Sequence, residues 1–253
     1  MCSISLCIPT MNRFDTFLKS YLQSYLKYLN EGIIQEIVIC DETGEDYEKI
    51  IKTFGVAPNF KVFKNDVVLG VFKNKLKVAS LASFDYIALI DSDNFCDETY
   101  FKTVREYIIN NESSFSTSVI LSPSFAKPSY SLNYKIFEGK VVTKTNLNYF
   151  LNNNHTLFTT LLNTGNYIVN KNIINNIKCD ESVMYKTTSC DVIYFNMLAF
   201  LQFEDFQLHI VKNLEYEHVV HPGSLYLNTH HNCDDYLNNF IIPQYKKIAT
   251  NTL

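Results

Sequence analysis

The chain has 253 residues, 47% of them hydrophobic and 19% charged, which is the composition of a folded globular protein and excludes a disordered one. Its 22 basic and 26 acidic residues give a net charge of −4, so it lacks the excess of Lys and Arg with which proteins neutralise a nucleic-acid backbone. The sequence contains no run of about 18 apolar residues, the length that a helix needs to span a bilayer, so we expect no membrane span. Its seven scattered cysteines favour a reducing compartment over a disulfide framework, and we therefore expect a cytoplasmic protein.

The first hundred residues alternate between the patterns of strands and helices. Apolar runs typical of buried strands occupy residues 3–8, 36–40, 60–63 and 86–90. Apolar residues at helical spacing predict helices over 16–29, from about 46 to 54, and over 70–82. Because strands that alternate with helices pair in parallel through right-handed crossovers, we expect an α/β, Rossmann-like fold with a mostly parallel sheet flanked by helices.

The second half of the chain is less regular. We expect helices over 99–109, 170–177 and 191–201, strands over 118–121, 135–143 and 208–211, and a polar tail from about 228 that ends in a helix. No Pro- or Gly-rich linker interrupts the sequence. We therefore expect a single continuous domain over 1–253, made of a first half (1–97), a second half (98–227) and a tail (228–253).

The strand over 86–90 is followed by Asp91-Ser92-Asp93. Open α/β sheets bind ligands at the carboxyl ends of their strands, and alternation along an extended chain sends Asp91 and Asp93 to the same side. Two carboxylates so placed could share one divalent cation and, through it, a diphosphate. Taken alone, the pair could also be a solvated acidic turn.

Four segments occur in the order and spacing of a known family. They are Cys7-Ile8-Pro9-Thr10-Met11-Asn12-Arg13, Ile37-Val38-Ile39-Cys40-Asp41, Leu69-Gly70-Val71-Phe72-Lys73-Asn74 and Ala88-Leu89-Ile90-Asp91-Ser92-Asp93. Together they resemble the nucleotide-sugar half of GT-A glycosyltransferases, particularly family 2. The segment His218-Val219-Val220-His221-Pro222-Gly223-Ser224-Leu225 resembles the His-x-Gly-Ser segment that many such enzymes carry after the acceptor region. The resemblance implies a GT-A fold in which residues 1–97 bind the nucleotide sugar and residues 98–227 bind the acceptor.

The resemblance also implies residues that bind the donor. Turns and polar groups at the strand ends would meet the base, ribose and phosphates, and Asp41 would meet the edge of the base unless it caps a helix instead. Gly70 would let the backbone approach the ligand, and the charge of Lys73 would favour an anion, whereas Lys75 and Lys77 are expected to be solvated. The implied set is Pro9, Thr10, Asn12, Arg13, Asp41, Gly70, Lys73, Asn74, Asp91, Ser92, Asn163, Gly165 and Asn166. For Asn163 to Asn166, an Asn-Gly turn without chemical function is the alternative.

For a metal site the resemblance implies Asp93 as a direct ligand, Asp91 shared between the ribose and metal-bound water, and His221 as the third ligand. His218 is the spare candidate. The expected cofactor is Mn²⁺, or Mg²⁺, because Mn²⁺ accepts mixed imidazole and carboxylate ligands. The sequence His230-His231-Asn232-Cys233 lacks a second pair of ligands and is expected to be a polar loop.

An inverting transferase needs a carboxylate that removes the proton of the acceptor hydroxyl. The resemblance assigns this role to Asp191, although Cys190 and Ile193 stand where relatives carry acidic residues. Asp191 could instead cap the helix that follows it, and Asp180 and Glu181 are reserve candidates for the base.

The expected protein is thus a metal-dependent, inverting glycosyltransferase. Its donor would be a UDP-sugar, with GDP- and dTDP-sugars as alternatives, and its acceptor a hydroxyl on a glycan, a glycoprotein or a small molecule. Two other functions stay open, a non-catalytic module that binds sugar nucleotides or glycans and a sugar nucleotidyltransferase. The nucleotidyltransferase fits less well, because the chain of such an enzyme would open with a Gly-rich loop.

Overall fold

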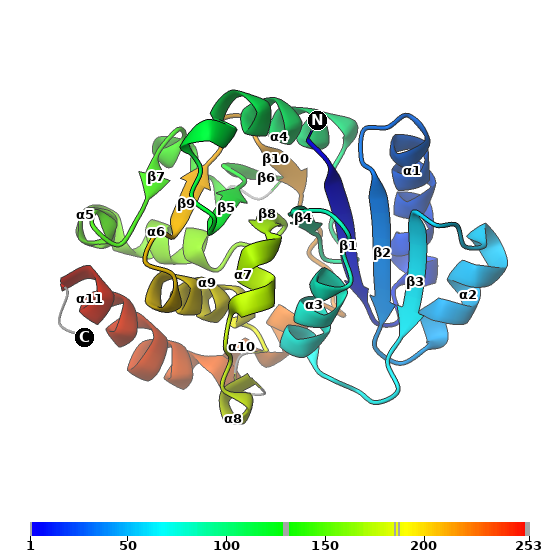
Figure 1. Cartoon of the computed structure of the whole chain (residues 1–253). Coiled ribbons are helices and arrows are strands. Elements are labelled where there is room, and N and C mark those ends of the chain that lie inside the picture. Colours follow the sequence, from blue (N-terminus) through cyan, green and yellow to red (C-terminus); the bar gives the residue numbers. More distant parts are fainter. Residues whose placement is uncertain (1, 129–131, 185, 187, 251–253) are drawn as a thin grey trace.

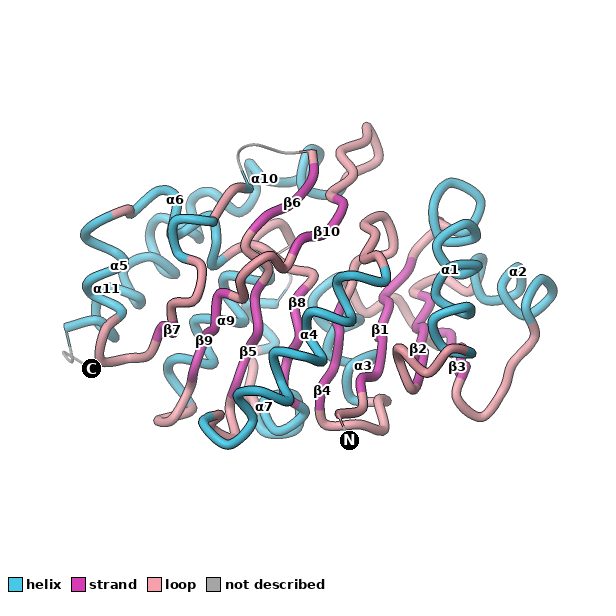
Figure 2. The backbone as a smooth tube through the Cα atoms, turned by 90° about the horizontal axis from the view of Figure 1, so that it is seen from above, coloured by secondary structure: helices cyan, strands magenta, loops and turns pink. Residues whose placement is uncertain are grey.

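The computed structural model describes residues 2–128, 132–184, 186 and 188–250. Its centre is an eight-stranded sheet in the order β3-β2-β1-β4-β8-β5-β9-β7, with a separate two-stranded sheet of β10 and β6 (Figures 1 and 2). The strands are β1 (Ile4–Thr10), β2 (Glu36–Asp41), β3 (Phe60–Lys64), β4 (Tyr86–Leu89), β5 (Val119–Ser122), β6 (Phe125–Lys127), β7 (Val141–Val142), β8 (Tyr167–Asn170), β9 (Gln207–Ile210) and β10 (Glu215–Glu217).

The large sheet joins a parallel block to a mixed one. Strands β3, β2, β1 and β4 pair in parallel, and so do β5 and β9. Strand β8 lies antiparallel between β4 and β5, and β7 pairs antiparallel with β9. The expected α/β fold with a mostly parallel sheet is therefore confirmed.

Helices cover both faces of the sheet. The longer ones are α1 (Lys19–Asn30), α2 (Glu45–Phe54), α3 (Val71–Ser80), α4 (Glu98–Asn111), α9 (Asp191–Gln202), α10 (Leu225–Tyr236) and α11 (Ile242–Thr250). The shorter ones are α5 (Leu147–Asn153), α6 (His155–Leu162), α7 (Lys171–Asn176) and α8 (Glu181–Met184), with single turns at Phe14–Leu18, Glu112–Ser114, Lys135–Phe137 and Leu237–Ile241. None of the described helices is long and apolar enough to cross a membrane.

Alternation along the central strands builds a separate core on each side of the sheet. In β1, Leu6 and Ile8 join the core that contains residues of α1 and α4, while Cys7 joins the core that contains residues of α3 and α9. This explains why β1 and β4 appear in the sequence as nearly continuous apolar runs, since a central parallel strand is buried on both faces.

Two expectations for the second half are wrong, and a third is confirmed. The strand expected over 135–143 is a single helical turn followed by the two-residue β7, because Gly139 between them has a φ of +72°, which ends any extended run. The helix expected over 170–177 is confirmed as α7 (Lys171–Asn176), which directly follows β8. The polar loop expected at His230 to Cys233 lies within α10, with Cys233 buried.

The carboxyl ends of β1, β2 and β4 meet at one edge of the sheet. Thr10 pairs with Asp41 across β1 and β2, and Cys7 pairs with Leu89 across β1 and β4. The loop after β1 is held there by Asp46 in the first turn of α2. Its buried carboxylate accepts hydrogen bonds from the Thr10 hydroxyl at 2.6 Å, from the Arg13 N–H at 2.9 Å and from the Phe14 N–H at 3.0 Å.

Asp46→Ala should therefore destabilise the protein. The substitution leaves a hydroxyl and two backbone N–H groups without their acceptor, and we expect the free energy of unfolding to fall by about 3 kcal/mol. Urea unfolding at neutral pH measures this loss. Glu45→Ala, which removes the exposed acid one residue earlier in the same helical turn, is the control and should change stability by less than about 0.5 kcal/mol. Equal losses in the two variants would show that Asp46 does not anchor the loop.

Candidate active site

The turn after β4 presents Asp91 and Asp93. The Asn94 N–H donates to the Asp91 carbonyl at 3.0 Å, which closes the turn, and the Asp91 N–H donates to Asn166 Oδ1 at 2.9 Å. Asn166 is buried, has a φ of +60°, and accepts the Tyr100 hydroxyl on its own carbonyl at 2.7 Å. The Asn166 side chain therefore fixes the position of Asp91 by accepting the Asp91 backbone N–H.

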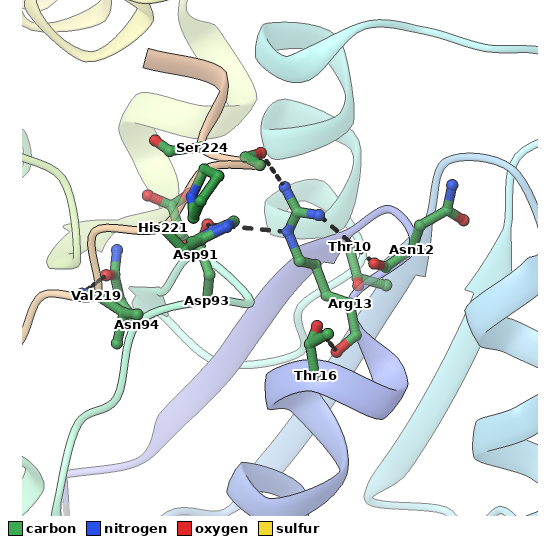
Figure 3. Close-up of polar contacts among 12 residues, drawn as sticks. Thr10, Asn12, Arg13, Thr16, Asp91, Asp93, Asn94, Val219, His221 and Ser224 are labelled. Carbon is green, nitrogen blue, oxygen red and sulfur yellow. Dashed lines mark hydrogen bonds and ion pairs between the residues drawn. The ribbon is translucent and has the colours of Figure 1, made fainter. Parts of the chain in front are cut away.

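Asp93 meets the segment that follows β10. Nε2 of His221 lies 3.0 Å from Asp93 Oδ2, and Nε of Arg13 lies 3.9 Å from the same oxygen (Figure 3). The Arg13 guanidinium also donates to the Gly223 carbonyl at 2.7 Å, and the Val219 N–H donates to Asn94 Oδ1 at 3.0 Å. Three segments far apart in the sequence are thus joined in one polar cluster.

Asp91 faces a different cation. Nζ of Lys75 lies 2.9 Å from Asp91 Oδ1 and 2.9 Å from Asp191 Oδ2, and the Lys75 side chain is only 13% exposed. The expectation that Lys75 is solvated is therefore wrong. Lys73, which the resemblance had favoured, lies 3.4 Å from the exposed Glu181 instead. Two residues along a helix turn the side chain by about 200°, so Lys73 and Lys75 cannot face the same site.

Asp191 is the first residue of α9, and Cys190 before it is the N-cap, without a side-chain cap. The alternative of Asp191 as the cap is therefore not what the structure shows. The start of α9 is held by Asn163, which accepts the Ile193 N–H at 3.2 Å and donates to the Ser189 carbonyl at 3.3 Å. Asn163 thereby sets the direction in which the Asp191 side chain projects from the start of α9.

Burial and ion pairing together shift the pKa values of Asp191 and Lys75. It raises the pKa of the Asp191 carboxyl above its ordinary value, and Lys75 opposes that effect. Burial alone would lower the pKa of Lys75, but the carboxylates of Asp191 and Asp91 raise it well above its ordinary value. Lys75 and Asp191 border a small cavity whose other walls include Phe72, Leu89, Tyr167 and Phe195, and these apolar walls account for the poor solvation of the two groups. Lys75 therefore stays protonated.

Several implied donor residues use their polar groups within the protein. The buried Asp41 accepts the Tyr47 N–H at 2.8 Å and the Thr43 N–H at 3.3 Å, which is the helix-capping alternative, and burial raises the pKa of its carboxyl. The buried Asn74 donates to the Cys40 carbonyl at 3.2 Å and accepts from Asn65 at 3.0 Å.

The loops at the ends of β1 and β3 hold the remaining residues. Pro9 and Thr10 end β1, and the exposed Asn12 has a φ of +56° and accepts the Thr43 hydroxyl at 3.3 Å. Gly70, the N-cap of α3, has a φ of +84° and donates its N–H to the buried Glu42. Sequence analysis missed Glu42 and Asp46, and the available signal was that both follow a strand that ends at the ligand-binding edge.

The expected metal ligands are not gathered as a set of three. Within the described residues no group of three or more His, Cys, Asp or Glu side chains is arranged to hold a metal. Asp93 and His221 are paired, and Asp91 turns to Lys75. Nδ1 of the spare candidate His218 lies 3.4 Å from the Tyr216 hydroxyl, and burial lowers the pKa of His218. The reserve base Asp180 is exposed and accepts from Ser182.

Part of the chain matches a known protein family, and part of it is similar to a curated relative. Residues 5–176 match the model of glycosyl transferase family 2. A curated relative, the glucosyl-dolichyl phosphate glucuronosyltransferase of Haloferax volcanii, is 22% identical over 130 residues, which are 51% of this chain and 41% of that protein. The chain thus spans less than half the length of this relative.

Solved structures share the whole fold. S. aureus TarS 1–349 in complex with UDP-GlcNAc is 17% identical with a TM-score of 0.65, over 99% of this chain and 71% of that one. Glucosyl-3-phosphoglycerate synthase from Mycobacterium tuberculosis, in complex with Mn²⁺, UDP and phosphoglyceric acid, is 13% identical with a TM-score of 0.62, over 96% and 78%. The expected GT-A fold is confirmed by these likenesses. With two thirds of its residues inside the family match, this chain belongs to glycosyl transferase family 2.

Proposed function

We propose that the protein transfers a glycosyl group from a nucleoside diphosphate sugar to a hydroxyl of a glycan, a glycoprotein or a small acceptor, with inversion and with the help of a divalent cation. The observation that carries the proposal is the arrangement at the carboxyl edge of the sheet. There a family 2 chain places Asp93 beside His221, and Asp91 and Asp191 on either side of Lys75.

The relatives favour a UDP-sugar over a GDP- or dTDP-sugar. TarS was solved with UDP-GlcNAc, and the mycobacterial synthase with UDP and Mn²⁺. In this chain the Arg13 guanidinium supplies positive charge beside Asp93, where a diphosphate held by the cation would lie. The implied residues Pro9, Thr10, Asn12, Ser92 and Gly165 complete the proposed donor site.

Asp93 and His221 fit a divalent cation by the chemistry of their donor atoms. One carboxylate and one imidazole nitrogen, 3.0 Å apart, are the mixed set that Mn²⁺ accepts more readily than Mg²⁺, and phosphate oxygens and water would fill the other positions. Asp91 is proposed to act beside them, through the ribose and water. A cation bound there supplies charge that stabilises the departing diphosphate.

Asp191 is the proposed base. Inversion requires a carboxylate opposite the leaving group, and Asp191 carries its charge in a poorly solvated niche where a proton acceptor is strengthened. Its oxygen Oδ2 is buried and lies 2.9 Å from Nζ of Lys75, and this ion pair favours the ionised carboxylate, which is the form that can accept a proton from a substrate hydroxyl. The seven cysteines, none of them in a disulfide, support a cytoplasmic location.

Screening UDP-, GDP- and dTDP-sugars, with and without Mn²⁺, tests the function as a whole. We expect release of UDP from one sugar nucleotide only when the cation is present, and removal of the cation with EDTA should abolish it. Tight binding without turnover, with every acceptor tried, would favour the non-catalytic binding module instead.

Asp191→Asn should lower the rate of sugar transfer by about 1,000-fold, because the amide cannot accept the proton, while the affinity for UDP stays within about threefold. The base is active only when ionised, and burial raises the pKa of Asp191 above the ordinary 3.8. The wild-type rate should therefore fall, as the pH decreases, at a point above pH 3.8. Asp180→Asn, at the exposed reserve position, is the control and should transfer at close to the wild-type rate.

His221→Ala should raise the Mn²⁺ concentration needed for half-maximal transfer by about 10- to 100-fold, because it removes one of two protein ligands. Titration calorimetry of Mn²⁺ in the presence of UDP measures the same loss without turnover. His231→Ala, on the exposed side of α10, is the matched control. Unchanged Mn²⁺ binding in His221→Ala would remove His221 from the proposed site.

A further inference from the structure

Two carboxylates that lie 100 positions apart in the sequence share one ammonium group. Nζ of Lys75 is 2.9 Å from an oxygen of Asp91 and 2.9 Å from an oxygen of Asp191. The exposed fractions of the three side chains are 13% for Lys75, 32% for Asp91 and 10% for Asp191. Asp91, on the donor side of the site, is thus the most exposed of the three side chains, and the proposed base Asp191 is the most buried.

All three elements that carry these groups are fixed by other polar contacts. Helix α3, which carries Lys75, begins at Gly70, whose N–H is held by Glu42. Asp91 is held through its N–H by Asn166, and the start of α9 is held by Asn163. The Lys75 ammonium group therefore lies between two carboxylates whose backbone positions are held by hydrogen bonds.

The niche is also closed at its side. A Cβ atom added at Gly165 would lie 3.4 Å from Val192 Cγ2 and 3.7 Å from Asp91 Oδ2, so the chain at Gly165 passes close to both acidic elements. Because apolar side chains line the cavity at Lys75 and Asp191, and Asp191 is only 10% exposed, little water is available on that side to screen its carboxylate from that of Asp91. Without a cation between them they would repel, and one would move away or take up a proton.

We propose that Lys75 is a positioning residue of the transfer reaction, which holds the base Asp191 in register with Asp91 of the donor site through a single buried ammonium group. The inference rests on the proposed function, because it assigns Lys75 its role through Asp191. Lys75 does not touch the reacting atoms. It fixes the distance and direction between the carboxylate that activates the acceptor and the carboxylate that meets the donor.

The test compares Lys75→Met with Lys75→Arg, using the sugar nucleotide that the wild-type protein turns over. In Lys75→Met we expect kcat to fall by about 100-fold while the KM for the donor changes less than about threefold, because a base displaced by about 1 Å loses the reaction more than the binding. Lys75→Arg keeps the charge and should recover kcat to within about tenfold of wild type. Lys77→Met, on the same helix and partly exposed, is the control and should match wild type.

Each outcome decides between the proposals. A kcat of Lys75→Met within a few-fold of wild type, or a loss that Lys75→Arg does not repair, overturns the positioning role while the proposed function stands. A wild-type protein that turns over no sugar nucleotide overturns the proposed function, and the inference falls with it. If Lys75→Met does not fold, Lys75→Arg carries the test, and the role is rejected if its kcat lies more than about tenfold below wild type at unchanged thermal stability.

Discussion

The parallel pairing of β2, β1 and β4 is the constraint on which the site depends. It brings the ends of three strands to one edge, where Thr10, Asp41 and the turn at Asp91 lie side by side. Parallel strands put the loops at their carboxyl ends together, and N–H groups at the start of α2 and α3 then face the same edge, where Asp41 and Glu42 accept them. A concentration of acidic side chains is stable there because each finds a donor or a cation.

Sequence analysis predicted the strands and helices of the first half well because each repeats its pattern over enough residues. β1, β2 and β4 are apolar runs that end in a polar residue, and the helices between them show a period of about 3.6. Past residue 97 the four-residue apolar strands β5 and β9 were still predicted, whereas the two-residue β7 has too few positions to reveal a period. The antiparallel pairing of β8 could not be predicted, because its partners β4 and β5 lie far away in the sequence.

The site was predicted in its parts and not in its contacts. Asp91, Asp93, Asp191 and His221 were all identified from short motifs, and the structure brings Asp93 to His221. The Lys75 ammonium group that joins Asp91 to Asp191 was not predicted, because motif spacing pointed to Lys73 as the positive charge near the donor and Lys75 was expected to be solvated. The anchoring roles of Asn163 and Asn166 were missed because a hydrogen bond to a distant backbone N–H leaves no pattern in one sequence.

The partners of the acidic groups separate those that build the fold from those that can serve chemistry. Asp41, Glu42 and Asp46 are buried, and each accepts backbone N–H groups, which cannot leave without unfolding the loop that supplies them. Asp91, Asp93 and Asp191 instead face side chains, namely those of Lys75, Arg13 and His221. The side chains of Arg13 and His221 can turn away by a change of rotamer when a cation or a diphosphate arrives, whereas a backbone amide cannot, and Lys75 stays between its two carboxylates. For this reason the second group of carboxylates is available to a substrate, although the first lies at the same edge of the sheet and carries the same chemical group.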